Sequence, residues 1–148
     1  MTSISFYKVG GDHAAAALLA CQLILKASQR DQPVLCLVER EQQAEALSQQ
    51  LWAVEPHAFV AHGRELHQPV AITTGGEPGE HHGLLLNLCA QTPSWFSRFD
   101  RVIELIHSEP HYQQAKRERF AFYQQRGYPL DYHDLSAKFP AASGSASA

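Results

Sequence analysis

The stretch ISFYKVGGDHAAAALLACQLILKASQRDQPVLCLV, residues 4–38, contains a strand, a helix and a second strand in that order. Residues 4–9 are rich in β-branched and aromatic side chains, which predicts a strand. Asp12 can cap the helix that the apolar spacing predicts over residues 13–29. The continuous apolar run at residues 34–38 is typical of a strand covered on both faces, as in a parallel sheet. Two parallel strands joined by a helix predict a right-handed crossover.

The rest of the chain continues this alternation. A second amphipathic helix is predicted over residues 41–52. Three further strands are predicted, at residues 70–73, 84–88 and 101–106. We expect the strand at 101–106 to be the last one, and to lead into a final helix. This order favours an α/β fold, doubly wound around a mostly parallel sheet with helices on both faces. We expect one domain over residues 1–134 and a disordered tail over residues 135–148, which ends in AASGSASA and has little to bury.

Composition and charge limit the classes of function. The 148 residues are 45% hydrophobic and 18% charged, which is ordinary for a globular protein. The net charge is −3 with neutral histidines, and no Lys/Arg block appears outside residues 116–119, so strong direct binding to DNA or RNA is not expected. No apolar run reaches the roughly 18 residues that span a bilayer. Three scattered cysteines in apolar surroundings indicate reduced, buried thiols, and we expect a cytoplasmic protein without membrane association.

Motifs for nucleotide, metal or catalytic chemistry are weak. The turn after the first strand lacks the G-x-G-x-x-G and P-loop patterns, and Asp12 would put a negative charge where a phosphate should sit. Nine histidines suggest a metal, but His57, His62 and His67 recur every five residues, a spacing that aligns ligands on neither a helix nor a strand. We therefore expect no cofactor, no metal and no catalytic residues. The alternative is a small metal-dependent α/β hydrolase or nuclease that uses this histidine-rich middle segment.

The final predicted helix carries a candidate binding site. Pro110 suits its first turn, and Gly127 suits its end. One flank presents Gln113, Arg117 and Phe120, and the last two are three residues apart and hence neighbours on the helix surface. A guanidinium beside an exposed ring suits a ligand that carries both a carboxylate and an apolar group. The alternative is a solvated helix flank with one stray Phe.

Two more aromatic residues follow the second predicted helix. Trp52 stands at its end, and Phe59 follows seven residues later. Large aromatics near a helix end can belong to the core, or they can form the wall of a binding pocket. Both interpretations stay open on the residues alone.

An ordered set of residues, spread over about residues 4–134, matches a known family. Its members are Phe6-Tyr7, Cys21, Leu51-Trp52, Phe59 with His62, Pro69-Val70, Arg101-Val102, Arg117-Glu118-Arg119-Phe120, Tyr123 and Gly127. By this set the chain resembles the chi subunits of bacterial DNA polymerase III. The resemblance implies a Rossmann-like fold and a non-catalytic replication adaptor.

The resemblance also implies partners and residues that bind them. In this family one partner is the C-terminal tail of single-stranded DNA-binding protein, an acidic peptide that ends in Pro-Phe. Another is the psi subunit, which links chi to the clamp loader. Carried over by position, the tail site comprises Trp52, Phe59, Arg117 and Phe120. Lys116 and Arg119 would attract the aspartates of the tail as contacts at the rim. The predicted residues that bind the tail are therefore Trp52, Phe59, Lys116, Arg117, Arg119 and Phe120.

The sequence departs from the family pattern around that site. Phe120 stands where a Tyr is familiar, which removes a hydroxyl and keeps the ring. Gln113 and Ala121 stand where lysines are familiar. We therefore expect weaker electrostatic attraction for the acidic part of the tail and an unchanged anchor for its terminal carboxylate and Phe.

Overall fold

A parallel sheet is the centre of the computed structural model, which describes residues 1–54 and 62–140. Its seven described strands are β1 (Ser3–Lys8), β2 (Val34–Leu37), β3 (His62–Gly63), β4 (Val70–Thr73), β5 (Leu84–Asn87), β6 (Arg101–Ile106) and β7 (Leu130–Asp134). The strand order is β3-β4-β2-β5-β6-β1-β7, and every neighbouring pair is parallel. The carboxyl ends of the strands therefore meet at one edge of the sheet.

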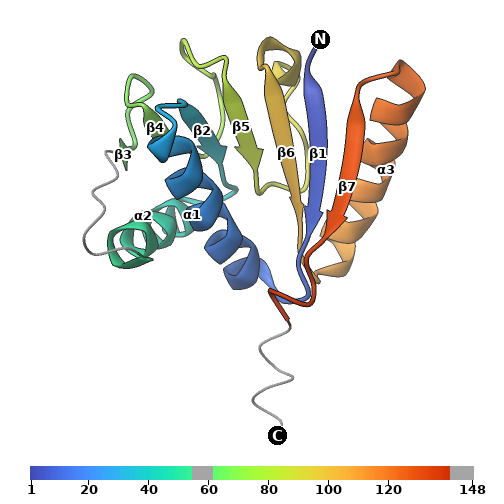
Figure 1. Ribbon diagram of the computed structural model, residues 1–148, viewed down its shortest axis with the longest axis horizontal. Coiled ribbons are helices and arrows are strands. Elements are labelled where there is room, and N and C mark those ends of the chain that lie inside the picture. The colour runs from blue at the N-terminus through green and yellow to red at the C-terminus, as the bar shows by residue number, and fades with distance from the viewer. Residues whose placement is uncertain (55–61, 141–148) are drawn as a thin grey trace, which may run out of the picture.

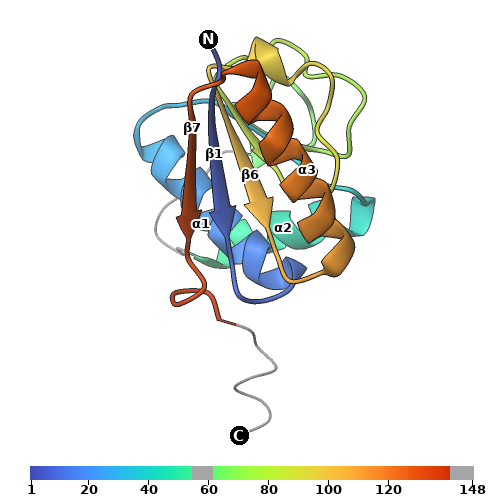
Figure 2. The same cartoon turned by 90° about the vertical axis from the view of Figure 1, so that its right-hand side faces the viewer.

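The described helices cover both faces of this sheet (Figure 1). α1 (His13–Gln29) and α2 (Glu41–Val54) lie on one face, and α3 (Pro110–Arg126) lies on the other, where Figure 2 shows it beside β6. A short 3-10 helix, η1 (Phe96–Arg98), precedes β6. This arrangement confirms the predicted doubly wound α/β fold. None of the described helices combines the length and the apolar character needed to cross a membrane.

Local signals fix the helix ends. The Asp12 carboxylate accepts a hydrogen bond from the backbone N–H of Ala14 at 3.0 Å, which caps α1. α3 begins at Pro110, where a missing N–H costs nothing, and it is terminated by Gly127. The φ of Gly127 is 76°, in the left-handed region that favours glycine.

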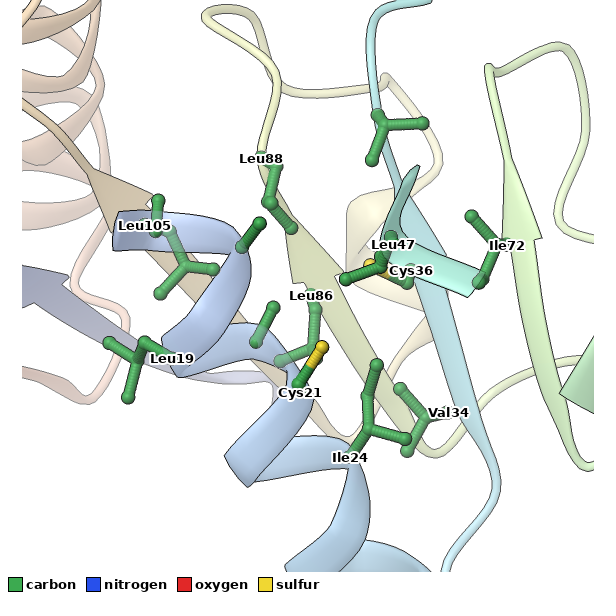
Figure 3. Close-up of a cluster of buried hydrophobic side chains, with 14 of the residues drawn as sticks. Leu19, Cys21, Ile24, Val34, Cys36, Leu47, Ile72, Leu86, Leu88 and Leu105 are labelled. Atoms are coloured by element: carbon green, nitrogen blue, oxygen red, sulfur yellow. The ribbon is translucent and has the colours of Figure 1, made fainter. Parts of the chain in front are cut away.

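The main core lies between the sheet and the pair α1 and α2 (Figure 3). Cys21 and Ile24 of α1 and Leu47 of α2 pack with Cys36 of β2 and Leu86 of β5. Burial raises the pKa of the Cys21 thiol to about 12, so this group acts as a small apolar side chain. Alternate strand residues serve a second core on the other face, which explains why the central strands read as unbroken apolar runs.

The expectation that residues 101–106 form the last strand is wrong. β7 follows α3 and pairs with β1, with Phe6 beside Tyr132 in the register. The sequence of β7, LDYHD, lacks the apolar run of the other strands because it lies at the edge of the sheet, where four of its five residues are exposed.

The expected boundary at residue 134 is also too early. The backbone N–H of Leu135 donates to the carbonyl of Lys8 at 2.7 Å, and that of Gly10 donates to the carbonyl of Phe139 at 2.7 Å. The Phe139 side chain is only 8% exposed and joins the main core. The domain therefore includes residues 135–140, and the rest of the predicted tail, residues 141–148, lies outside the described residues.

Candidate functional site

A pocket of about 250 Å³ opens between α3 and the strands β1, β6 and β7. Its lining residues are Phe6, Lys8, Ile106, Gln113, Lys116, Arg117, Phe120 and Tyr132. The predicted flank of α3, Gln113 with Arg117 and Phe120, therefore forms one wall of a real cavity, and the sheet forms the other wall.

Strand register explains why these side chains meet. Phe6 and Lys8 are two residues apart on β1, so both point toward α3. Phe6 is the register partner of Tyr132 on β7, and Lys8 is the register partner of Ile106 on β6. Side chains from three adjacent strands are thus aligned on the face that α3 covers.

One end of the pocket is aromatic. The ring of Phe120 lies 5.3 Å from that of Phe6 and 6.2 Å from that of Tyr132, both in edge-to-face geometry. Phe6 is fully buried, whereas Tyr132 is 48% exposed. Rings held in this way form an apolar slot that can receive another aromatic side chain edge to face.

The pocket also carries uncompensated positive charge. Arg117 is exposed, and its Nη1 donates only a long hydrogen bond, 3.4 Å, to Gln114 Oε1. Within residues 1–54 and 62–140, no carboxylate lies at ion-pairing distance from Arg117 or from Lys8. A guanidinium without a carboxylate beside an apolar slot is suited to bind a carboxylate that belongs to a ligand.

Lys116 was predicted to contact a ligand at the rim, and this prediction is wrong. Its side chain is fully buried, and its Nζ lies 2.7 Å from Glu104 Oε1, which is also fully buried. Only the stem of Lys116 contributes to the pocket wall, because its charge is directed into the sheet and neutralised there.

The carboxylate of Glu104 is saturated with donors. Its Oε1 accepts from Lys116 Nζ and, at 2.9 Å, from Asn87 Nδ2. Its Oε2 accepts from Tyr123 OH and from Thr92 Oγ1, each at 2.7 Å. Burial raises the pKa of Glu104, but Lys116 and the hydrogen bonds from Tyr123 and Thr92 outweigh it and hold this pKa below its usual range. This buried network ties α3 to β5 and β6 directly beneath the pocket.

Arg119 does not line the pocket either. Its guanidinium stacks over the rings of Phe96, Phe122 and Tyr123, at 4.8, 4.0 and 4.9 Å from their centroids. Two helical residues rotate the side chain by about 200°, so Arg119 lies on the opposite flank from Arg117. Its predicted rim contact beside Phe120 is wrong, since cation–π packing holds Arg119 elsewhere.

Trp52 was predicted to stand opposite Arg117, and the structure does not bring them together. Trp52 belongs to α2, on the other face of the sheet from α3 (Figures 1 and 2). Its ring is 5.0 Å from that of His62 in β3, and the residue is 55% exposed. Phe59, the second predicted wall residue, lies outside the described residues. The pocket under α3 is therefore built without Trp52, and its aromatic wall is Phe6 and Tyr132.

The histidine-rich middle segment has a different local role. The Nε2 of His62 is 2.8 Å from Ser48 Oγ, which links β3 to α2, and His67 is exposed beside Glu65. His57 lies outside the described residues. In the part of the chain that the structure describes, no group of three or more His, Cys, Asp or Glu side chains is arranged to hold a metal ion.

Sequence reasoning missed four residues of the pocket: Phe6, Lys8, Ile106 and Tyr132. Strand alternation puts Phe6 and Lys8 on one face of β1, but it does not tell which helix covers that face. Tyr132 belongs to the strand that the sequence did not predict. These contacts depend on strand order, which periodicity does not encode.

Comparison with known proteins assigns the family. The family model for "DNA polymerase III chi subunit, HolC" matches residues 1–131. A DNA polymerase III subunit chi from Pseudomonas aeruginosa is 37% identical over 139 residues, which cover 91% of this chain and 98% of that protein. The proteins of the same name from Haemophilus influenzae and Escherichia coli are each 25% identical, and the matches cover 79% and 88% of this chain and 85% and 97% of theirs.

A solved structure resembles the fold without close sequence similarity. The crystal structure of T4 UvsW matches with a TM-score of 0.65 at 8% identity. The match covers 91% of this chain and 42% of that one. At this identity the likeness concerns the α/β fold alone.

Proposed function

The chain belongs to the DNA polymerase III chi subunit family, whose members are replication accessory subunits, and on this basis we propose that it is a non-catalytic adaptor. It binds the C-terminal tail of single-stranded DNA-binding protein in the pocket under α3, and a psi subunit links it to the clamp loader. The buried, unpaired thiols of Cys21 and Cys36 suit a protein of the reducing cytoplasm.

One observation carries the tail assignment: an unpaired guanidinium beside an aromatic slot. The terminal Phe of the tail packs against the rings of Phe120 and Tyr132 that line the pocket. Its α-carboxylate then accepts hydrogen bonds from Arg117, which has no carboxylate partner among the described residues. A site of this size should bind with micromolar affinity and be sensitive to salt.

Titration with a peptide that ends in Asp-Pro-Phe tests this function. We expect micromolar binding of the peptide with a free C-terminus. Amidation should weaken binding about tenfold, because it removes the charge that Arg117 recognises. Isothermal titration calorimetry of the two peptides measures the difference. Equal affinities would show that the terminal carboxylate is not recognised.

An adaptor needs a second surface, remote from the tail pocket, for its other partner. Trp52 is a candidate for that surface, because it is 55% exposed on the face of the sheet opposite α3. Large, partly exposed aromatics are frequent anchors of protein interfaces. We assign Trp52 to contact with the psi subunit, so that both partners can bind at once.

Trp52→Ala separates the two surfaces. We expect the affinity for the tail peptide to change by less than twofold, because Trp52 does not line the pocket. Binding to the psi subunit should be weakened at least tenfold if Trp52 is an anchor there. Peptide titration and co-purification with psi measure the two effects. A parallel loss of peptide binding in a folded variant would put Trp52 back in the tail site.

A further inference from the structure

We propose that Lys8 is a second anchoring cation of the pocket, and that it selects a tail with an aspartate upstream of Pro-Phe. This inference rests on the proposed function and adds the source of its acidic selectivity. Neither Lys8 nor any other residue of β1 was among the predicted contacts with the tail.

The pocket has an aromatic end and a polar end. Phe6 lies in register with Glu104 and Tyr132, at the level of the aromatic slot. Lys8 lies two residues further along β1, about 7 Å toward the carboxyl edge of the sheet, in register with Ile106. The cation therefore stands beyond the slot.

α3 repeats this order on the opposite wall. Phe120 lies at the aromatic end, and Gln113 is seven residues earlier, about 10 Å along the helix axis. Arg117 lies between them. A terminal Phe in the slot, with its carboxylate on Arg117, directs the preceding residues of the peptide toward Lys8 and Gln113.

Charge balance makes Lys8 the remaining cation for an acidic side chain. The charge of Lys116 is neutralised by Glu104, and Arg119 lies on the other flank of α3. Gln113 and Ala121 are uncharged. Lys8 is only half-buried and forms no ion pair with any residue of the described part of the chain.

Asp134 is the carboxylate of the protein that could compete with a ligand for Lys8. It is the register partner of Lys8 on β7. Its Oδ1 accepts from the backbone N–H of Ser136 at 2.9 Å, and hydrogen bonding to Ser136 is the main reason that the pKa of Asp134 is lowered, with Lys8 contributing less. Because Asp134 is held by Ser136, Lys8 stays available to a ligand, and removal of the Asp134 charge should strengthen binding.

A double-mutant cycle tests the contact directly. Calorimetric titrations pair the unmodified protein and Lys8→Gln with free-carboxylate peptides that end in Asp-Pro-Phe or Asn-Pro-Phe. We expect Lys8→Gln to weaken the aspartate peptide three- to fivefold, in the range of a partly exposed ion pair, and the asparagine peptide less than 1.5-fold. Lys8→Arg, which keeps the charge, should retain the preference for aspartate. Asp134→Asn should improve binding of the aspartate peptide.

The possible outcomes distinguish the role of Lys8 from the proposed binding of the tail. If Lys8→Gln weakens both peptides by the same factor, or neither, while amidation still weakens binding to the unmodified protein, the role of Lys8 is wrong and the tail function stands. If the unmodified protein binds neither free-carboxylate peptide, both are wrong. Thermal unfolding of each variant checks that the fold is intact, as the half-buried position of Lys8 leads us to expect.

Discussion

Replacing Lys116 with methionine should lower the free energy of unfolding by about 3–5 kcal/mol, because it leaves the Glu104 carboxylate buried without its counter-charge. Methionine preserves most of the side-chain volume, so the loss reports charge rather than a cavity. Asn87, Tyr123 and Thr92 would still donate to Glu104, but neutral donors do not replace an ammonium at 2.7 Å. Urea unfolding followed by circular dichroism measures the change.

Lys26→Met is the matched control. Lys26 is an exposed lysine on α1, and its replacement should change the free energy of unfolding by no more than about 0.5 kcal/mol. If Lys116→Met costs as little as Lys26→Met, the buried pair does not hold α3 against the sheet.

The pH dependence of Lys116→Met should have a characteristic sign. In the unmodified protein the pKa of Glu104 is lowered, so its stabilisation is present above the unfolded pKa of about 4.3 and is lost as the pH falls. Without Lys116, burial dominates and raises this pKa, so the contribution of Glu104 is retained at low pH and lost as the pH rises. The stability gap between the two proteins should therefore narrow from pH 7 to pH 4.5. A gap that is independent of pH would contradict the ionised state of Glu104.

The fold was largely predictable because its central elements carry strong periodic signals. α1, with its Asp12 cap, and β4 and β6 begin and end where the sequence predicts. β7 was missed, since an edge strand with one paired side needs no apolar run. Elements that bury both faces are thus visible in sequence, whereas an edge strand that is fixed mainly by backbone pairing is not.

The candidate site was predictable only on the side of the helix. Helical spacing correctly made Arg117 and Phe120 neighbours, and both line the pocket. The same spacing places Lys116 one turn after Tyr112 and two turns before Tyr123, on the buried arc. Its charge suggested exposure, because buried lysines are rare, and its partner belongs to another element. The sheet wall needed strand order and register, which exist only in three dimensions.

Arg117→Ala should weaken binding of the Asp-Pro-Phe peptide about thirtyfold, or about 2 kcal/mol, the range for hydrogen bonds to a charged group. Arg117 is the guanidinium beside the slot formed by Phe6, Phe120 and Tyr132, and it is exposed, so its removal leaves the fold unchanged. Arg117→Lys should recover part of the affinity, because a lysine supplies charge without the two-pronged geometry that matches a carboxylate. Calorimetric titration measures all three proteins.

Two comparisons assign this loss to the terminal carboxylate. Arg126→Gln removes one positive charge from the exposed last turn of the same helix, and it should change peptide affinity by less than twofold. Amidation should weaken binding to the unmodified protein but have little further effect on Arg117→Ala, because the partner of the carboxylate is already gone. If amidation costs Arg117→Ala as much as it costs the unmodified protein, another residue binds the carboxylate. Arg117 would then lie beside the aromatic slot without binding the carboxylate of the peptide.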